Sequence, residues 1–488
     1  MNPTLTLDGA NRMAIGLARA RGLRYQEAEE ELRNLSLRLV WTLPGSGSLA
    51  QQLALLTAAN SAARAFLGGV QVELPDEIPL VVSISGVATL NGALGWAGVS
   101  SVALSNPTCT LYLGEPDARA QPDDVVIFCD AWRGGAGDVR DETKFLMGDQ
   151  DHLGLGGIFA GALAVHRCFV RAAHLPGQCL DQTCGLSLWD PSADWRQPVK
   201  GVRLRQLPIR YWMLGLGHLG QGYLWSLAFL PFPDVASVEF LLHDFDQIDE
   251  SNFGSGVICI QGALRRKKTR HCAAWLERLG FSTSITERRF TTADRRSDDD
   301  PAIAFCGFDN VSARQGLDTA GFGLVLECGL GGSLADFDQI DLHTFPSPRH
   351  SAHSLWGAFS DRKGPISDAI AQLFASDVDE VCGALAIDIA GKSVSTSFVG
   401  AIAGALATAE MLRVFNRGAI FDDTSFDLRN PLRHSALASG QRFKASELAA
   451  MGVVSVSAPE SKPGSDADNF AYEQRTRRKL QRIPILSE

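Results

Sequence analysis

A glycine-rich segment, MLGLGHLGQG, joins an apolar strand-like run to a helix-like run and places Gly215, Gly217 and Gly220 in GxGxxG spacing. Glycine lets the backbone approach a phosphate closely, and the N-terminus of the following helix offers unpaired N–H groups and a positive partial charge. The segment therefore predicts a phosphate-binding turn. Taken alone, this spacing also occurs in enzymes that transfer hydride from a nicotinamide, so it does not choose between the two chemistries.

Acidic and polar residues are dense at the end of the next apolar run, VEFLLHDFD. Asp244 and Asp246 end that run, and Ser251 and Asn252 follow shortly after it. In a doubly wound parallel sheet, ligands bind outside the carboxyl ends of the strands, so this cluster is expected beside the glycine turn. A nicotinamide-binding domain needs only one acidic residue here, to hold the ribose hydroxyls, and the additional polar residues favour a different chemistry.

Two further charged motifs follow in order along the chain. The run RRKK at 265–268 opens an amphipathic helix in which Leu276 lies eight residues after Lys268. The strand-like AIAFCGF then ends in Asp309 and Asn310, with Arg314 four residues beyond the asparagine. When a carboxylate attacks the α-phosphate of a nucleoside triphosphate, lysine and metal must neutralise the phosphates as pyrophosphate leaves. Lysine and aspartate at this edge of the sheet suit that reaction.

Together these motifs resemble the ThiF/MoeB and ubiquitin-activating enzyme family, whose pattern runs GxGxxG, DxD, SN, a lysine eight residues before a helical leucine, and DN followed by arginine. The match runs from Arg210 to about Asn416. The resemblance implies that the chain uses ATP and Mg²⁺, with Asp244 holding the ribose, Lys268 neutralising the triphosphate and Asp309 binding the metal. The nucleotide-binding positions that it implies are Gly215, Gly217, Gly220, Asp244, Asp246, Asn252, Lys268 and Asn310.

One position departs from the family pattern. The family usually has an arginine three residues after the asparagine of SN, and this chain has Ser255 there. Arg265 or Arg266 could replace it from the next turn, or the first half of the chain could lend an arginine, as the dimeric partners of the family do. The sequence leaves these alternatives open.

Alternating strand-like and helix-like runs predict an α/β fold with a parallel, doubly wound sheet in each half of the chain. In the first half, an apolar run at 37–43 leads through PGSGS into a helix at 49–69, and strands are expected at 70–74 and 79–85. The segments GIFAGALA at 157–164 and GAIAGALA at 400–407 resemble each other, which indicates duplication or a shared packing requirement. No DxD or DN motif is found in the first half, and the family resemblance therefore implies that it is an inactive adenylation-like domain.

Three units follow from these patterns: an inactive domain at 1–200, an active adenylation domain at 201–435, and a linker and C-terminal tail at 436–488. The tail holds a turn-rich stretch at 457–468 and a basic helical candidate at 470–483, for which docking of an acidic partner and a solvated tail are the alternatives.

Composition and charge bear on the partners and the location of the protein. The chain has 488 residues and a formal net charge of −10, which does not favour nucleic acid or an acidic membrane. The N-terminus lacks a secretory signal, and ten scattered cysteines without paired CxxC spacing indicate free thiols in a reducing compartment, so we expect a cytoplasmic protein. Apolar stretches at 153–164 and 398–412 are shorter than a membrane span requires and predict buried helices.

In activating enzymes, the cysteine that forms a thioester lies in an insertion, which corresponds here to about 346–392. Cys382 lies within it and follows the acidic residues Asp377, Asp379 and Glu380, which should keep the thiol accessible. Cys306 and Cys328 are weaker candidates, because each lies in an apolar strand pattern where cysteine is usually a small buried hydrophobe. A structural Cys382, with the adenylate passed on directly, is the alternative.

The family resemblance implies adenylation of the C-terminal glycine of a ubiquitin-like protein, thioester formation on Cys382 and transfer to a conjugating enzyme. The fusion of an inactive and an active half is similar to bacterial conjugation systems of the Bil type, which are encoded in antiphage operons; a homodimer is possible. The alternative is ThiF/MoeB-like adenylation of a sulfur-carrier protein or another small carboxylate, although that group commonly has a zinc site of two CxxC pairs. A nicotinamide-dependent oxidoreductase and a catalytically dead scaffold are the alternatives from other functional classes of protein.

Overall fold

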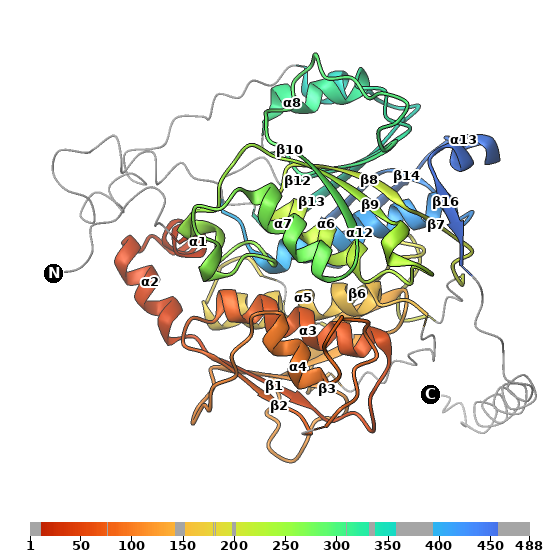
Figure 1. Ribbon diagram of the computed structural model, residues 1–488. Coiled ribbons are helices and arrows are strands. Elements are labelled where there is room, and N and C mark those ends of the chain that lie inside the picture. Colours follow the sequence, from red (N-terminus) through yellow and green to blue (C-terminus); the bar gives the residue numbers. More distant parts are fainter. Residues whose placement is uncertain are drawn as a thin grey trace, which may run out of the picture.

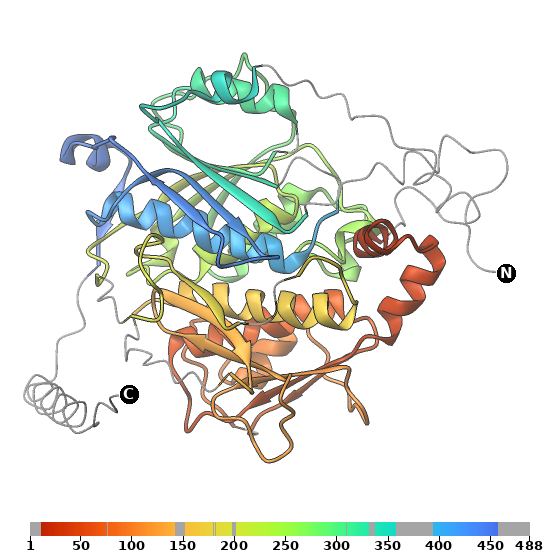
Figure 2. The ribbon, with the colours of Figure 1, turned by 180° about the vertical axis from the view of Figure 1, so that it is seen from behind.

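The computed structural model describes residues 11–75, 77–141, 152–178, 180, 182–197, 202–308, 310–330, 337–357 and 394–456. Helices from both halves of the chain fill the space between two β-sheets (Figures 1 and 2). These elements form layers in the order sheet, helices, helices, sheet, and the short helices at 311–315 and 352–356 lie beyond the second sheet. This mixed α/β architecture agrees with the fold class expected from the sequence.

The first sheet is built from residues 37–187 and has the strand order β2-β1-β3-β4-β5-β6. Strands β1 to β4 are parallel, whereas β5 and β6 pair antiparallel. Its strands are β1 (Leu37–Trp41), β2 (Val70–Glu73), β3 (Cys109–Leu113), β4 (Val125–Cys129), β5 (Arg133–Asp138) and β6 (Cys184–Ser187). The strand expected at 79–85 does not form; only an isolated bridge joins Pro79 to Thr89. The backbone of this segment forms a different hydrogen bond, because the Val81 amide donates to the side chain of Gln52.

The second sheet has the strand order β10-β9-β8-β11-β12-β13-β14-β15. The parallel strands are β8 (Arg210–Leu214), β9 (Glu239–His243), β10 (Ser282–Thr286), β11 (Ile303–Cys306) and β12 (Leu324–Leu330). The antiparallel strands are β13 (Gln339–Phe345), β14 (Phe421–Asp427) and β15 (Ser435–Ala438).

The central helices are α3 (Leu49–Ala65) and α5 (Leu155–Ala172) from the first half and α6 (His218–Ala228) and α12 (Ser397–Phe415) from the second. Helix α5 packs against α3, and α12 packs against α6 and α5. Glycines allow this close approach: a Cβ on Gly157 would lie 1.8 Å from the Ala50 carbonyl oxygen, and one on Gly404 would lie 2.1 Å from the Gly222 carbonyl oxygen. The two similar octapeptides therefore occupy equivalent places and meet the same packing requirement.

Both apolar stretches form interior helices, as expected. Helices α5 and α12 are long and apolar enough to cross a membrane by length and composition. However, 89% of α5 and 100% of α12 are buried inside the protein. They form the contact between the two halves of the chain, which accounts for their apolar character.

The two sheets differ in how their outer faces are covered, and the expectation of two doubly wound sheets was wrong for the first. Helices α8 (Val311–Gln315) and α9 (Ala352–Trp356) contribute to an apolar cluster with Trp212 and Leu214 on the outer face of the second sheet. On the outer face of the first sheet, Val40, Tyr112 and Val126 form a small cluster that receives no residue from a described helix. Helices α3 and α5 pack on the inner face of this sheet, and α5 itself connects the antiparallel strands β5 and β6.

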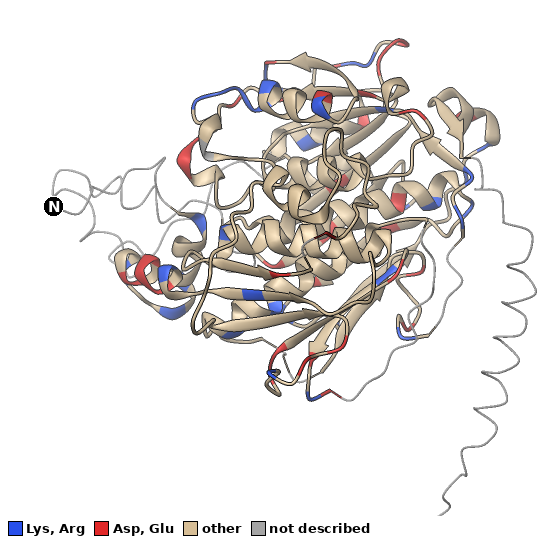
Figure 3. Cartoon of the chain, turned by 60° about the horizontal axis from the view of Figure 1, so that its bottom comes forward, with Lys and Arg blue, Asp and Glu red and all other residues tan. Residues whose placement is uncertain are grey.

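The chain stays ordered beyond the point where the sequence suggested a linker. Strand β15 forms one edge of the second sheet, α13 (Ala445–Ala450) follows it, and β16 (Val453–Ser455) pairs antiparallel with β7 (Gln206–Pro208). This pairing ties residues near 455 to the start of the second half. The segments at 457–468 and 470–483 lie outside the described residues. In the view of Figure 3, acidic and basic residues are interspersed over the outer elements.

Candidate active site

The glycine turn lies where the strand order of the second sheet reverses. Strands β9 and β10 lie on one side of β8, and β11 and β12 lie on the other. Strand β8 ends at Leu214, and α6 begins at His218 with Gly217 as its N-cap. In open parallel sheets this switch point, at the carboxyl ends of the strands, is the usual ligand-binding position.

Each of the three glycines has its own structural reason. Gly215 has φ of 82°, a conformation that L side chains rarely adopt. A Cβ on Gly220 would lie 2.0 Å from the Gly215 carbonyl oxygen, so the first turn of α6 can pack against the loop only with glycine there. A Cβ on Gly217 would meet no atom within 4 Å. The backbone at Gly217 therefore faces open space at the N-terminus of α6, as a phosphate-binding turn requires.

Asp244, at the carboxyl end of β9, holds the glycine turn in place. Its Oδ2 accepts a hydrogen bond of 2.6 Å from the Leu216 amide, and its Oδ1 accepts one of 2.8 Å from the Asp246 amide. The residue is buried, with 8% of its surface exposed. Each carboxylate oxygen can accept a second hydrogen bond, so anchoring the turn leaves Asp244 able to bind a further donor.

Lys268 is the first residue of α7 (Lys268–Arg278), and its Nζ lies 3.2 Å from Asp246 Oδ2. The Lys268 amide also donates to the Asp246 carbonyl oxygen, which brings the start of α7 to the end of β9. Burial lowers the pKa of Lys268, but the carboxylates of Asp244, Asp246 and Asp249 outweigh it and raise the pKa overall. The ammonium group is thus held in its charged form.

Ser251 and Asn252 belong to a short turn that is closed by its own side chains. Asp249 Oδ1 accepts hydrogen bonds from the Ser251 hydroxyl, at 2.6 Å, and from the Asn252 amide, at 3.1 Å. The Asn252 side chain in turn accepts from the Asp249 amide. Asn252 is therefore a capping residue here. Ser255, where the family pattern has arginine, is buried, and its hydroxyl lies 3.4 Å from the Ser251 carbonyl oxygen, to which it donates.

Arg12 reaches the second half from the first, and the sequence gave no signal that singled it out. It is the first residue of α1 (Arg12–Arg21), and its Nε donates to the Ser251 hydroxyl at 3.1 Å. Burial, together with the charges of Arg12 and Lys268, lowers the pKa of His218 to about 4. Both cations therefore act on the first turn of α6. His218 Nε2 is buried there without a hydrogen-bond partner among the described residues.

The other arginine alternatives lie elsewhere. Arg265 has φ of 65° in the turn before α7, and Arg266 lines a pocket beside His271 and Arg278 instead of the glycine turn. Two arginines of the first half reach this segment: Arg12 contacts the Ser251 hydroxyl, and Arg64 donates to the backbone carbonyl oxygens of residues 256, 257 and 259.

The end of β11 forms the other side of the switch point. A Cβ on Gly307 would lie 3.1 Å from the Gly220 amide nitrogen, so this strand end abuts the glycine turn. Asn310 caps α8 by accepting a hydrogen bond of 2.9 Å from the Ala313 amide, and Arg314 donates to the Phe308 carbonyl oxygen. Asp309 itself lies outside the described residues. The described residues contain no group of three or more His, Cys, Asp or Glu side chains placed to hold a metal ion.

Arg314 is itself held by a buried carboxylate. Its Nε lies 3.1 Å from Glu327 Oε1, and Glu327 Oε2 lies 2.8 Å from His343 Nδ1. Burial lowers the pKa of His343, but Glu327 and the nearby aspartates outweigh it and raise the pKa.

Eight of the ten cysteines lie in the described part of the chain, and Cys382 lies outside it. All eight described cysteines are free thiols, as the sequence predicted. Cys306 in β11 and Cys328 in β12 are completely buried, and burial raises the pKa of both thiols. Neither is placed to act as a nucleophile. Cys382 and most of the segment around it lie outside the described residues.

Comparison with known proteins decides the family. Residues 207–418 match the model of the BilD C-terminal domain, and residues 43–188 match that of the BilD N-terminal domain. The chain is 34% identical over 382 residues to the bacterial E1-like protein BilD of Collimonas sp. (strain OK412). The aligned region covers 77% of this chain and 81% of that relative. The chain belongs to the BilD family of bacterial E1-like proteins. The resemblance to E1-like proteins that the motifs indicated is therefore confirmed.

Solved structures show only a distant likeness to this BilD-family chain. The structure of E. coli MccB with MccA-N7isoASN is 14% identical at a TM-score of 0.33, over 48% of this chain and 65% of that one. The structure of E. coli MccB with ATP is 12% identical at a TM-score of 0.32, over 48% and 64%. PaaA is 12% identical at a TM-score of 0.31, over 47% and 64%. This chain thus spans just under two thirds of those chains, and a likeness at this level does not bear on the site.

Proposed function

We propose that this BilD-family chain adenylates the C-terminal carboxylate of a ubiquitin-like protein at the glycine turn. The observation that supports the proposal is the convergence of Gly217, Lys268 and Arg12 at the N-terminus of α6. In the reaction, a carboxylate oxygen forms a bond to the α-phosphorus of ATP, the bond from that phosphorus to the bridging oxygen breaks, and pyrophosphate leaves. Developing negative charge on the phosphates would be stabilised by the two cations and by the helix N-terminus.

The described residues fit a nucleotide at this position. The backbone at Gly217 faces open space, and His218 Nε2 is a buried polar atom without a hydrogen-bond partner in the described part of the chain. In the proposal, Asp244 keeps the turn in shape and holds the ribose, while Lys268 and Arg12 neutralise the triphosphate. Asp309 would hold a Mg²⁺ ion, which would supply further charge neutralisation when bound.

The first half is proposed to be an inactive adenylation-like domain at 1–200 that completes the active domain at 201–435. Its strand β2 is followed by Leu74 and Pro75 where β9 is followed by Asp244. It also supplies Arg12. The chain is proposed to act in the cytoplasm within a conjugation system of the antiphage kind.

The experiment is ATP–pyrophosphate exchange with a purified ubiquitin-like protein, and with the same protein lacking its C-terminal glycine. Exchange should require the intact C-terminus and Mg²⁺. Asp309→Ala should abolish exchange while the protein stays folded. If exchange proceeds equally with the truncated protein, that carboxylate is not the substrate.

We also propose that Cys382 receives the activated protein as a thioester, with AMP as the leaving group, before transfer to a conjugating enzyme. The support is the burial of the alternatives, because Cys306 and Cys328 are enclosed in strands. Cys382→Ala should retain exchange and lose a reducible covalent adduct with the carrier protein. An adduct that persists in this variant would contradict the assignment and leave adenylation without an enzyme thioester at Cys382.

A further inference from the structure

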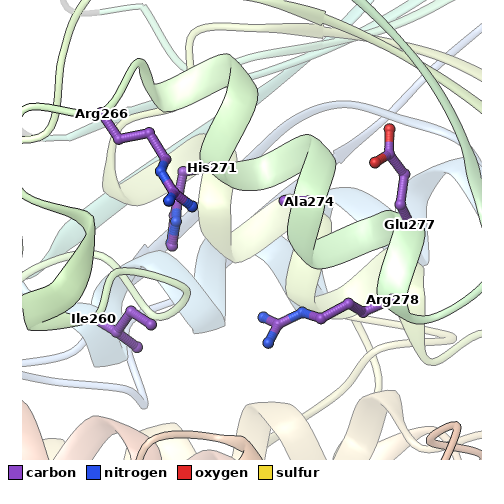
Figure 4. Close-up of a pocket in the computed structure, with 6 residues that line it drawn as sticks. All are labelled: Ile260, Arg266, His271, Ala274, Glu277 and Arg278. Carbon is purple, nitrogen blue, oxygen red and sulfur yellow. The ribbon is translucent and has the colours of Figure 1, made fainter.

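A second pocket lies beside α7, apart from the glycine turn. It has a volume of about 450 Å³ and is lined by Ile260, Arg266, His271, Ala274, Glu277 and Arg278 (Figure 4). None of these residues belongs to the glycine turn or to the acidic cluster after β9. The volume lies in the range of about 300–1,000 Å³ that small-molecule sites occupy.

Two arginines supply unbalanced positive charge to this pocket. Figure 4 shows the side chains of Arg266 and Arg278 extending toward the same open space, next to His271 and Ile260. Within the described part of the chain, neither guanidinium group forms a hydrogen bond or ion pair. Arg270, on the same helix, instead pairs with Glu287 at 2.8 Å. The two pocket arginines are thus cations without a protein counter-ion among the described residues.

The acidic residue of the pocket does not neutralise them. Figure 4 shows the Glu277 side chain turned away from Arg266 and His271. Its carboxylate accepts a hydrogen bond from the Thr283 hydroxyl on β10. The pocket therefore presents guanidinium groups on one side and the apolar side chains of Ile260 and Ala274 beside them.

Two histidines show that this pocket and the glycine turn hold separate groups of cations. Burial lowers the pKa of His271, and Arg266 and Arg278 lower it further. Burial also lowers the pKa of His218, but there the contributing cations are Arg12 and Lys268. The cations that act on His271 and on His218 are thus different residues.

We propose that Arg266 and Arg278 bind the phosphate group of a small organic phosphate monoester in this pocket, with its apolar part against Ile260 and Ala274. Guanidinium groups suit phosphate because their planar N–H donors match its oxygens in pairs. An exposed isoleucine beside them, at 44% exposure, gives the organic part an apolar contact. This site is additional to adenylation and does not depend on it.

The test is calorimetric titration of the full-length protein with phenyl phosphate, and with benzoate as a carboxylate of similar shape. The double variant Arg266→Gln/Arg278→Gln should bind phenyl phosphate at least about tenfold more weakly than the unsubstituted protein. The variant Arg270→Gln, on the same helix, should bind it as the unsubstituted protein does. Both arginines are exposed and unpaired in the described structure, so the double variant should keep its melting temperature.

Three outcomes would overturn the proposal. Phenyl phosphate that fails to bind the unsubstituted protein, or binds the double variant equally well, would remove the site. Binding lost in Lys268→Ala but kept in the double variant would place the anion at the glycine turn. Benzoate that binds as tightly as phenyl phosphate would show a carboxylate site instead.

Discussion

The turn between β1 and α3 in the first half and the turn between β8 and α6 in the second occupy equivalent positions but differ in what fills them. A Cβ on Gly47 would lie 2.8 Å from the ring of Trp41, so an aromatic side chain covers the first turn just before α3, although a Cβ on Gly45 would meet nothing within 4 Å. A Cβ on Gly217 would meet nothing within 4 Å. The two halves share their helix packing, and they differ in whether a side chain covers the backbone next to the N-terminus of the helix.

The residues that support the two turns differ as well. Ser48 caps α3, and its own hydroxyl accepts from the Gln51 amide at 3.2 Å. The second turn is instead anchored by Asp244, from a neighbouring strand, and it has a charged lysine beside it. The same architecture thus places different side chains at the two turns, and a few residues at the strand ends decide the difference.

The largest expected contrast between the two turns is in their response to acid. Helix α6 begins with His218, whereas α3 begins with Leu49. The pKa of His218 is lowered from 6.5 to about 4, so between those values an unfolded chain takes up a proton that the folded protein resists. The free energy of unfolding should therefore fall as pH drops through this window, by on the order of 2 kcal/mol from this residue, and the effect should be absent above it. Urea unfolding of His218→Gln at several pH values should show a flatter dependence, whereas the exposed first-half control His174→Gln should follow the unsubstituted curve.

Lys268→Ala tests whether positive charge at the second turn supports chemistry. One lost contact to the transition state corresponds to about 1.4 kcal/mol, so pyrophosphate exchange should fall by at least about tenfold. Arg270→Ala removes an exposed arginine from the same helix and should leave exchange unchanged. Equal loss in both variants would indicate damage to α7 and not loss of a phosphate contact.

Matched alanine substitutions at Gly47 and Gly217 should have opposite consequences. Gly47→Ala should lower the free energy of unfolding by about 1 kcal/mol or more, because φ is 64° and the new methyl group meets Trp41. Gly217→Ala should leave the melting temperature nearly unchanged and weaken ATP binding by about tenfold, because its methyl group enters the space through which a phosphate would approach. If Gly217→Ala binds ATP normally, the open turn is not the nucleotide site.

The smallest effect is expected from Arg12, which contacts Ser251 from the first half. Arg12→Gln should reduce exchange by about threefold, which corresponds to about 0.7 kcal/mol for a partly exposed charge contact. Arg24→Gln, an exposed arginine of the same half that pairs with Glu27, should have no effect. An unchanged rate in Arg12→Gln would mean that the second half works without a cation from the first.

The sequence by itself determined the parts of this protein that depend on local pattern. The glycine spacing, the acidic end of β9 and the lysine that opens α7 were predicted as neighbours, because parallel strands bring their carboxyl ends to one edge of a sheet. The similar octapeptides in α5 and α12 predicted equivalent buried helices, since small residues four apart allow close helix packing. The resemblance to E1-like proteins could be read from the same motifs.

Tertiary structure decided what depends on contacts between distant residues. Arg12 precedes its partner Ser251 by 239 positions, and nothing in its own helix distinguishes it from the other arginines of α1. The ring of Trp41 packs against Gly47, and no described helix contributes to the apolar cluster on the outer face of the first sheet. Such contacts are set by how strands and helices are placed in space, and a periodic pattern along one chain segment does not record them.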